Sequence, residues 1–274
     1  MKQEIILPGV RNARELGGYP AAGKTIRKGV FIRSGALKQI SEEGIERLQK
    51  VYRLQTVVDF RMSMEREKLP DPVTLDCESI PLPVIEVEDY SVEKYSKEFP
   101  ELIKMLSDPK TDRMTISQKV IETGLVDDRM YVGFLMGDRG MRAFRAFFQA
   151  VLSLEEGRAL LWHCSDGKDR AGCAAMLLLF ALGASEETVY QDYLLTNEYN
   201  EDVLEAARKR AEAIHLPPDK LDLFLILSGC VSRLYLENAQ KAMTEHFGSV
   251  EGYLSGALGI GETERDLLRS RFLE

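Results

Sequence analysis

The sequence predicts an α/β fold in which a central parallel or mixed sheet is flanked by helices on both faces. Short β-branched or apolar runs, such as residues 55–59, alternate with segments of helical periodicity. Another run, residues 159–162, leads through a tight loop into a small apolar helix at 171–182. Such alternation is typical of parallel sheets, whose crossover helices lie on the sheet faces. The 274 residues, 45% of them hydrophobic, can bury a sizeable core, so a single domain over 1–274 is expected.

The elements of the first third follow in chain order. Residues 30–32 form a short strand. Ser41 caps a helix that runs to Leu48, with acidic residues in its first turn, where the helix dipole favours them. The buried strand at 55–59 turns into a helical segment, and a third extended piece follows it. These last two segments are residues 61–67 and 80–82.

The remainder of the chain is predicted to be helical apart from the strand at 159–162. Three helices are expected before that strand, at 92–106, 114–123 and 139–152. The segment 92–137 carries mixed charge and moderate apolarity, which leaves two interpretations open: a helical lid over a site, or a cover for the sheet. A helical C-terminal part, 185–274, is expected to wrap the core with helices at 185–195, 198–213, 218–228, 232–247 and 262–272.

Composition excludes several classes of function. A formal net charge of −8 argues against binding the phosphate backbone of nucleic acids, so any recognition of phosphate must be local. Four cysteines without paired spacing and three histidines predict neither a metal cluster nor a disulfide scaffold, and no cofactor is expected. No apolar run is long enough to span a membrane, and no signal peptide is apparent, so a cytoplasmic location is expected. The oligomeric state stays open.

Residues 163–172, His-Cys-Ser-Asp-Gly-Lys-Asp-Arg-Ala-Gly, contain the groups needed to break a phosphate ester through a cysteine. A loop between a strand and a helix points backbone N–H groups and the positive end of the helix dipole at an anion. Cys164 is the expected nucleophile, because a helix N-terminus and nearby cations favour the thiolate. Arg170 can grip phosphoryl oxygens with its planar fork. The expected phosphate cradle comprises Ser165, Asp166, Gly167, Lys168 and Arg170.

Two other interpretations of this segment are weaker. A structural cysteine beside a surface charge run would not require the complete string of His, Cys, two glycines and Lys-Asp-Arg. A Walker nucleotide loop is excluded, because no Gly-x-x-x-x-Gly-Lys-Ser/Thr occurs.

The loop resembles the signature of the cysteine-dependent protein tyrosine phosphatase superfamily, especially bacterial tyrosine and lipid phosphatases with the loop His-Cys-x-x-Gly-Lys-Asp-Arg-Thr-Gly. It is also similar to the Cys-Ser-Asp-Gly-x-Asp-Arg loop of the myotubularin phosphoinositide phosphatases. Similarity to the bacterial family extends to residues 12–19, 33–35, 58–61, 247–254 and 258–259. The resemblance implies a phosphatase fold and hydrolysis of phosphotyrosine or phosphoinositide monoesters, on a phosphorylated protein or lipid, through a phosphocysteine.

The resemblance implies that the proton donor to the leaving oxygen is Asp169, within the loop. Asp59, at the end of a predicted strand, is the main alternative, and a third possibility is that Asp169 only orients Arg170. Other candidate aspartates lack a distinctive setting; they are Asp71, Asp127, Asp128 and Asp138. Asp59 and Arg61 are expected to support the loop through an ion pair. His163 is expected either to brace the loop or to lower the pKa of Cys164.

Two positions depart from the family pattern. Ala171 replaces the Thr or Ser whose hydroxyl helps the cysteine leave, which predicts slow phosphoenzyme hydrolysis unless Ser165 compensates. Glu15 replaces an Asp. A catalytically weak module that binds phosphorylated ligands is therefore the competing function. A sulfur-transfer or arsenate-reducing enzyme is disfavoured by the long spacing from Cys164 to Arg170 and by the Lys-Asp pair within it.

Overall fold

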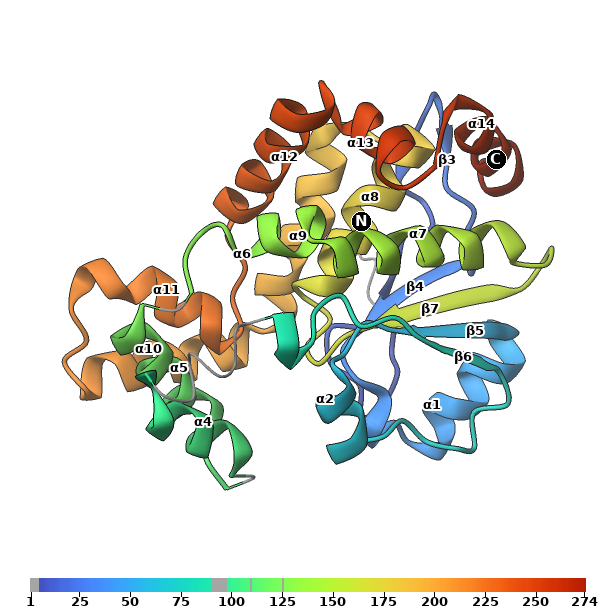
Figure 1. Cartoon of the computed structure of the whole chain (residues 1–274). Coiled ribbons are helices and arrows are strands. Elements are labelled where there is room, and N and C mark those ends of the chain that lie inside the picture. Colours follow the sequence, from blue (N-terminus) through green and yellow to red (C-terminus); the bar gives the residue numbers. More distant parts are fainter. Residues whose placement is uncertain (1–4, 90–97, 109, 125) are drawn as a thin grey trace.

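A five-stranded mixed sheet lies at the centre of the computed structural model, which describes residues 5–89, 98–108, 110–124 and 126–274 (Figure 1). Its strand order is β1-β4-β7-β5-β6. The bounds are β1 Arg14–Glu15, β4 Phe31–Ser34, β5 Leu54–Asp59, β6 Glu78–Pro81 and β7 Ala159–His163. Strands β4, β7, β5 and β6 are parallel, and β1 runs antiparallel to β4. The predicted α/β class is confirmed.

Side chains of β7 alternate between two buried faces, which explains why the strand is apolar throughout. Leu160 and Trp162 join a core formed with helices α7 (Asp138–Ser153) and α8 (Arg170–Leu182). Ala159 and Leu161 join the opposite core, with Leu48 and its neighbours around α1 (Glu42–Glu46) and the π-helical turn Arg47–Val51. Figure 1 shows α7 and α8 above the sheet, and α1 with α2 (Ser63–Lys68) below it. The loop at 163–172 thus follows a strand that is packed on both faces.

Most predicted elements are present, and the misses are short. Ser41 caps α1 as expected, accepting a hydrogen bond from Gly44 N at 3.1 Å. The hairpin β2 (Pro20–Ala21) with β3 (Lys24–Thr25) was missed, because two-residue strands carry no periodicity. The short helices α6 (Met130–Met136) and α13 (Val250–Gly256) were missed as well. Residues 92–97 of the expected helix 92–106 lie outside the described residues, and α4 begins at Pro100.

Four helices form a group with a small core of their own, on the left of Figure 1. They are α4 (Pro100–Ser107), α5 (Arg113–Thr123), α10 (Glu201–Ala213) and α11 (Pro218–Ser228). Ile121, Ala207 and Phe224 are buried at its centre. Within the expected segment 92–137, α4 and α5 therefore belong to this group, whereas α6 packs against α7, α8 and α12.

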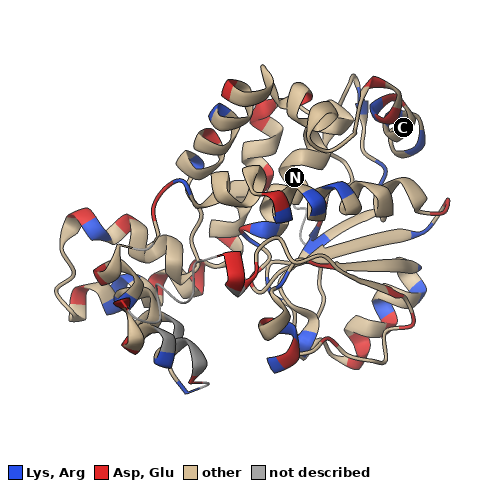
Figure 2. Ribbon diagram, viewed as in Figure 1, with Lys and Arg blue, Asp and Glu red and all other residues tan. Residues whose placement is uncertain are grey.

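The remaining C-terminal helices contribute to the cover around α8. Their bounds are α9 Glu186–Tyr199, α12 Arg233–Phe247 and α14 Glu262–Phe272. Charged residues of both signs alternate along the outer helices, whereas the central strands are largely uncharged (Figure 2). Among the described helices, none combines the length and apolarity needed to cross a bilayer.

Candidate active site

Cys164 lies at the turn from β7 into α8, where only 1% of its surface is exposed. The turn needs a glycine at position 167, whose φ of +69° is in the left-handed region. A Cβ added there would lie 2.4 Å from the carbonyl carbon of Ser34. Gly172 lets α8 pack closely, because an added Cβ would lie 3.3 Å from the Tyr193 ring. Glycine is therefore required at 167 by backbone conformation and is favoured at 172 by close packing.

Each carbonyl from Cys164 to Asp169 has a nitrogen within hydrogen-bond distance. Four of these carbonyls contact other elements, whereas Cys164 O contacts the ring of the preceding residue and Asp169 O accepts from Cys173 N in the first turn of α8. Because the C=O and the following N–H of a trans peptide point in opposite directions, carbonyls held on the outside turn the amides toward the inside of the loop. These contacts fit the expected anion cradle, in which the loop amides would face the bound anion. The six contacts are Cys164 O with His163 Nδ1 at 3.2 Å, Ser165 O with Ala36 N at 3.1 Å, Asp166 O with Asn12 Nδ2 at 3.1 Å, Gly167 O and Lys168 O with Arg33 Nη2 at 2.8 and 3.3 Å, and Asp169 O with Cys173 N at 2.8 Å.

A buried pair of arginines stabilises this outer surface. Arg14 and Arg33 are fully buried and share the carboxylate of Asp192. Arg14 Nε lies 2.9 Å from Asp192 Oδ1, and Arg33 Nη1 lies 2.5 Å from Oδ2. Burial alone would raise the pKa of Asp192, but the two guanidinium groups outweigh it and hold the pKa below its usual value. Sequence reasoning placed Arg14 and Arg33 in matching motifs without a role, and it missed Asp192, which lies in an unremarkable helix.

Arg170 is already oriented by Glu65 of α2. Its Nη1 and Nη2 donate to Glu65 Oε2 at 2.6 Å and to Oε1 at 3.0 Å, a bidentate pair. Burial would lower the pKa of Arg170, but the hydrogen bonds and charge of Glu65 raise it overall, so the guanidinium stays charged. Since arginine has five N–H donors, it can hold Glu65 and still present donors to a phosphoryl group. Glu65 was missed because its sequence context is that of an exposed helix.

Asp59, Arg61, Asp71 and His163 form a cluster behind the cysteine. Arg61 Nη2 donates to Asp59 Oδ2 at 2.7 Å and lies 3.0 Å from Asp71 Oδ1. His163 Nε2 lies 2.8 Å from Asp71 Oδ2. The ligand atoms of Asp59, Asp71 and His163 lie within 4.8 Å of one another, but the Arg61 guanidinium already balances both carboxylates. The arrangement suits a brace for the loop better than a metal site.

Asp169 and Lys168 are both engaged by neighbouring elements. Asp169 Oδ1 accepts a hydrogen bond from Tyr131 Oη of α6 at 2.6 Å, and its side chain is 19% exposed. Lys168 is buried; its Nζ donates to Ile226 O at the end of α11 and to Cys230 O at 3.2 Å, and lies 3.5 Å from Asp169 Oδ2. Its expected role in binding phosphate stays a prediction.

The two departures from the family pattern have clear local settings. Ala171 is fully buried, and its carbonyl accepts from Trp162 Nε1 at 3.0 Å. The hydroxyl of Ser165 donates to Glu65 and lies 3.3 Å from Arg170 Nη2, so it is engaged by groups other than the cysteine. Glu15 accepts from Gly29 N at 2.6 Å. The Ser165 hydroxyl is thus held by Glu65 and Arg170, and its expected compensation for the missing hydroxyl stays a prediction.

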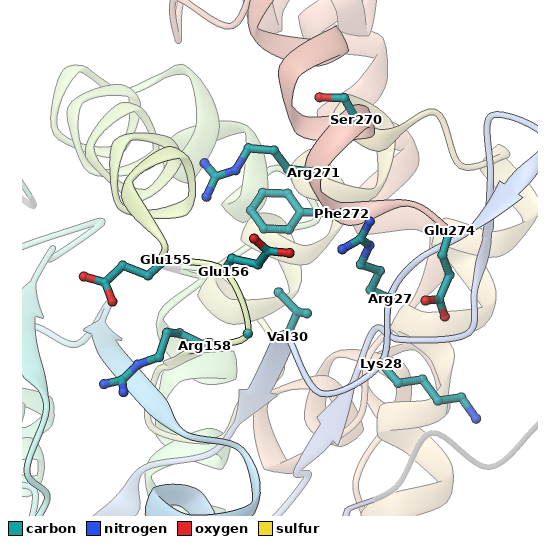
Figure 3. A pocket seen from close by; sticks show the side chains of 11 residues that line it. Arg27, Lys28, Val30, Glu155, Glu156, Arg158, Ser270, Arg271, Phe272 and Glu274 are labelled. Carbon is teal, nitrogen blue, oxygen red and sulfur yellow. The ribbon is translucent and has the colours of Figure 1, made fainter.

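A separate pocket of about 470 Å³ lies at the opposite end of the sheet, beside the starts of β4 and β7. Figure 3 shows side chains of both charge signs around Phe272. Arg271 in its wall donates to Leu152 O and Leu154 O. None of the residues that line this pocket belongs to the loop at 163–172.

Comparison with known proteins shows the family to which this sequence belongs. The sequence matches the tyrosine phosphatase family over residues 5–274. The chain belongs to this family. It is therefore a phosphomonoesterase of the protein tyrosine phosphatase superfamily, and the predicted resemblance to the bacterial enzymes is confirmed. The likeness to myotubularins stays an observation on the loop sequence.

Three bacterial relatives are similar to this phosphatase. A Cupriavidus necator protein named "Putative tyrosine-protein phosphatase" is 28% identical over 273 residues, covering 99% of this chain and 89% of the relative. The Mycobacterium tuberculosis triple specificity protein phosphatase PtpB is 25% identical over 299 residues, covering 97% of this chain and 98% of the relative. A Nostoc commune tyrosine-protein phosphatase is 28% identical over 134 residues, covering 47% of this chain and 43% of the relative.

Proposed function

We propose that this phosphatase hydrolyses phosphotyrosine and/or phosphoinositide monoesters through a phosphocysteine intermediate. The main supporting observation is that other elements bind four carbonyls of the loop, those of residues 165–168, since carbonyls held on the outside turn the loop amides toward an anion beside Cys164. Arg170, oriented by Glu65, adds a fixed guanidinium to the same loop. Arg33 and Arg170 are both close enough to interact electrostatically with Cys164.

The proposed reaction has two steps. In the first, Cys164 Sγ attacks phosphorus, an S–P bond forms, the P–O bond to the leaving group breaks, and Asp169 donates a proton to the departing oxygen. In the second, the Asp169 carboxylate accepts a proton from water, which attacks phosphorus while the S–P bond breaks. Inorganic phosphate leaves and the Cys164 thiolate is restored. Arg170 and the loop amides bind the equatorial oxygens in both steps.

Asp59 is less suited than Asp169 to donate the proton. Both of its oxygens already accept hydrogen bonds from Arg61, at 2.7 to 3.0 Å. With both oxygens bound by Arg61, neither oxygen of Asp59 is free to face a leaving group, whereas Asp169 Oδ2 accepts no comparably short hydrogen bond among the described residues. The ion pair supports instead the bracing role that the sequence suggests for Asp59 and Arg61.

The substrate class is proposed to include both aryl and inositol phosphates. The name of the Mycobacterium tuberculosis relative, a triple specificity phosphatase, supports activity on more than one class. Lys168, which the sequence assigns to the phosphate cradle, would serve additional phosphate groups only after leaving the carbonyls of Ile226 and Cys230. A panel of phosphotyrosyl peptides and phosphoinositides, assayed for phosphate release, separates the two classes.

We propose that α4 and α5 form part of a lid. They pack on α10 and α11, and the end of α11 contacts the loop through Lys168. Lys168 thus links the helical group to the loop, and the group would close over a bound substrate around this link. We also place the enzyme in the cytoplasm, because nucleophilic chemistry at Cys164 requires a free thiol.

The decisive experiment compares wild type with Cys164→Ser. Wild type is expected to release phosphate from p-nitrophenyl phosphate, and Cys164→Ser is expected to lose essentially all activity while still binding phosphate or vanadate. Rapid acid quench with a labelled substrate should trap label on the wild-type protein alone. Equal activity in the two proteins would remove Cys164 as the nucleophile.

A second candidate function, a catalytically weak module that binds phosphorylated ligands, is favoured by one specific observation. Ala171 supplies no hydroxyl, and that of Ser165 is engaged by Glu65. Wild type that binds vanadate but shows neither turnover nor a trapped phosphoenzyme would establish this alternative.

A further inference from the structure

The carboxylate of Asp169 accepts the last of two consecutive hydrogen bonds between side chains, which start from two tyrosines outside the loop. Tyr131 Oη of α6 donates to Asp169 Oδ1 at 2.6 Å, and Tyr193 Oη of α9 donates to Tyr131 Oη at 2.8 Å. Both tyrosines are almost fully buried, with 1% and 2% of their surfaces exposed. Buried hydroxyl groups need partners, and here each hydroxyl proton has a defined acceptor.

The direction of this chain is fixed by the protonation of Tyr131. Burial, and then the nearby Asp169 carboxylate, raise the pKa of Tyr131 well above its ordinary value, so it stays a phenol. A phenol has one proton. Because Tyr131 accepts the Tyr193 proton, its own proton is directed at Asp169.

The Tyr131 ring cannot readily turn away from Asp169. Its centroid lies 5.3 Å from that of Tyr235, 5.7 Å from Phe134 and 6.1 Å from Tyr193. Aromatic rings packed at such distances hold each other in place. Replacing the hydroxyl alone therefore leaves the apolar packing of the site unchanged.

We propose that Tyr131 is a positioning residue for proton transfer, which holds Asp169 Oδ1 so that the transferable proton lies on Oδ2. The inference rests on the proposed function, in which Asp169 is the proton donor. The two carboxylate oxygens are inequivalent, because Oδ1 accepts from Tyr131 whereas Oδ2 lies 3.5 Å from Lys168 Nζ. A hydrogen bond that strengthens as Asp169 becomes a carboxylate also stabilises the product of the transfer.

Other titratable groups interact with Asp169, and none duplicates this contact among the described residues. Within the loop and α8 they are Lys168, Arg170 and Cys173, and from the packed helices they are Tyr193 and Tyr235. Tyr131 is the member of this set whose hydroxyl donates directly to the carboxylate. Its removal should therefore change how Asp169 delivers a proton.

The test is a series of aryl phosphates whose leaving phenols increase in basicity, with kcat/KM measured for wild type and Tyr131→Phe. A basic leaving group needs the proton, whereas an activated one does not. We expect Tyr131→Phe to change kcat/KM less than about twofold for the most activated ester and to lower it about tenfold for the least activated, part of the ~10²–10⁴-fold that a general acid provides. The dependence on leaving-group basicity should become steeper.

Three further variants make the test specific. Tyr253→Phe removes a buried hydroxyl that donates to Leu135 O of the same helix α6 at 2.6 Å, without contacting Asp169, and should leave the slope unchanged. Tyr193→Phe should give a smaller change of the same kind as Tyr131→Phe. In an Asp169→Asn background, Tyr131→Phe should not change the dependence of kcat/KM on leaving-group basicity any further, because the two residues act as a unit.

The outcomes separate this inference from the function it rests on. If wild type and Asp169→Asn differ in slope but Tyr131→Phe behaves like Tyr253→Phe, the positioning role is wrong and the proposed function stands. Absence of turnover by the wild type contradicts the proposed function itself. A uniform loss across the series in Tyr131→Phe, with a lower melting temperature, would show a purely structural role and would also overturn the inference.

Discussion

Glu65 explains how one carboxylate organises the active loop at the level of single residues. It accepts hydrogen bonds from both terminal nitrogens of Arg170, from the hydroxyl of Ser165 and from the backbone amide of Met62. Burial would raise the pKa of Glu65, but Arg170 and Ser165 lower it overall, so the group is ionised at neutral pH. In the proposed reaction, Arg170 would therefore meet the phosphoryl group with its orientation already set.

Replacing that carboxylate should loosen Arg170. Glu65→Gln is expected to lower kcat/KM about tenfold and the free energy of unfolding by about 1.5–3 kcal/mol, the contribution of hydrogen bonds to charged groups. Steady-state kinetics and urea denaturation measure the two effects. Glu67→Gln, on the exposed side of the same helix, is the matched control and should change neither. Equal behaviour of the two variants would contradict the role of Glu65.

The alanine at position 171 leads us to expect that hydrolysis of the phosphoenzyme limits the rate. Without a hydroxyl to assist the cysteine as it leaves, phosphoenzyme hydrolysis should be slow, and wild type should show a burst of phenol release before steady state. Ala171→Ser should increase the steady-state rate about threefold to tenfold and reduce the burst, within the range that one positioned group provides. Stopped-flow measurement with p-nitrophenyl phosphate tests this. A wild type without a burst would place the slow step elsewhere.

At the scale of elements, Asp192 joins three parts of the fold. From α9 it binds Arg14 of β1 and Arg33 of β4, and Arg33 in turn holds two carbonyls of the loop. Asp192→Asn leaves two buried guanidinium groups without their counter-charge, which should cost about 3–5 kcal/mol of folding stability. Chemical denaturation measures this cost. Asp202→Asn, which removes an exposed partner of Arg11, is the control and should cost less than about 1 kcal/mol.

The sequence predicted the long elements well and the supports of the loop poorly. Residues 159–162 and 171–182 could be assigned because apolar runs and periodicity are local properties. Cys164, Asp169 and Arg170 could be singled out because they lie within one short string. Glu65, Tyr131 and Asp192 could not, because they act through contacts with residues more than 30 positions away.

At the scale of the whole molecule, buried carboxylates should make the fold sensitive to acid. Against the opposing effect of burial, the pKa values of Glu65 and Asp192 are lowered by their arginine partners, and that of Asp71 is lowered by its hydrogen bond with His163 and by Arg61. Their folded-state pKa values lie below the unfolded values of about 4, so these ion pairs stabilise the fold above pH ~4 and are lost as pH falls through the folded values.

The free energy of unfolding should therefore decrease from pH 7 to pH 3. Urea denaturation at a series of pH values tests this, with the steepest loss expected below about pH 4. Asp192→Asn should show a shallower decrease, because one of the titrating groups is absent. Stability that rises toward low pH would contradict the assignment of these groups as ionised in the fold.

The outward-held carbonyls of the loop also have a consequence for folding. Asn12 and Arg33 bind loop atoms 154 and 134 residues further along the chain. Contacts of such separation form late, because the entropy of closing a long loop of chain opposes them. The proposed phosphate cradle should thus be among the last features to form during refolding. Recovery of enzymatic activity would then report completion of the whole domain.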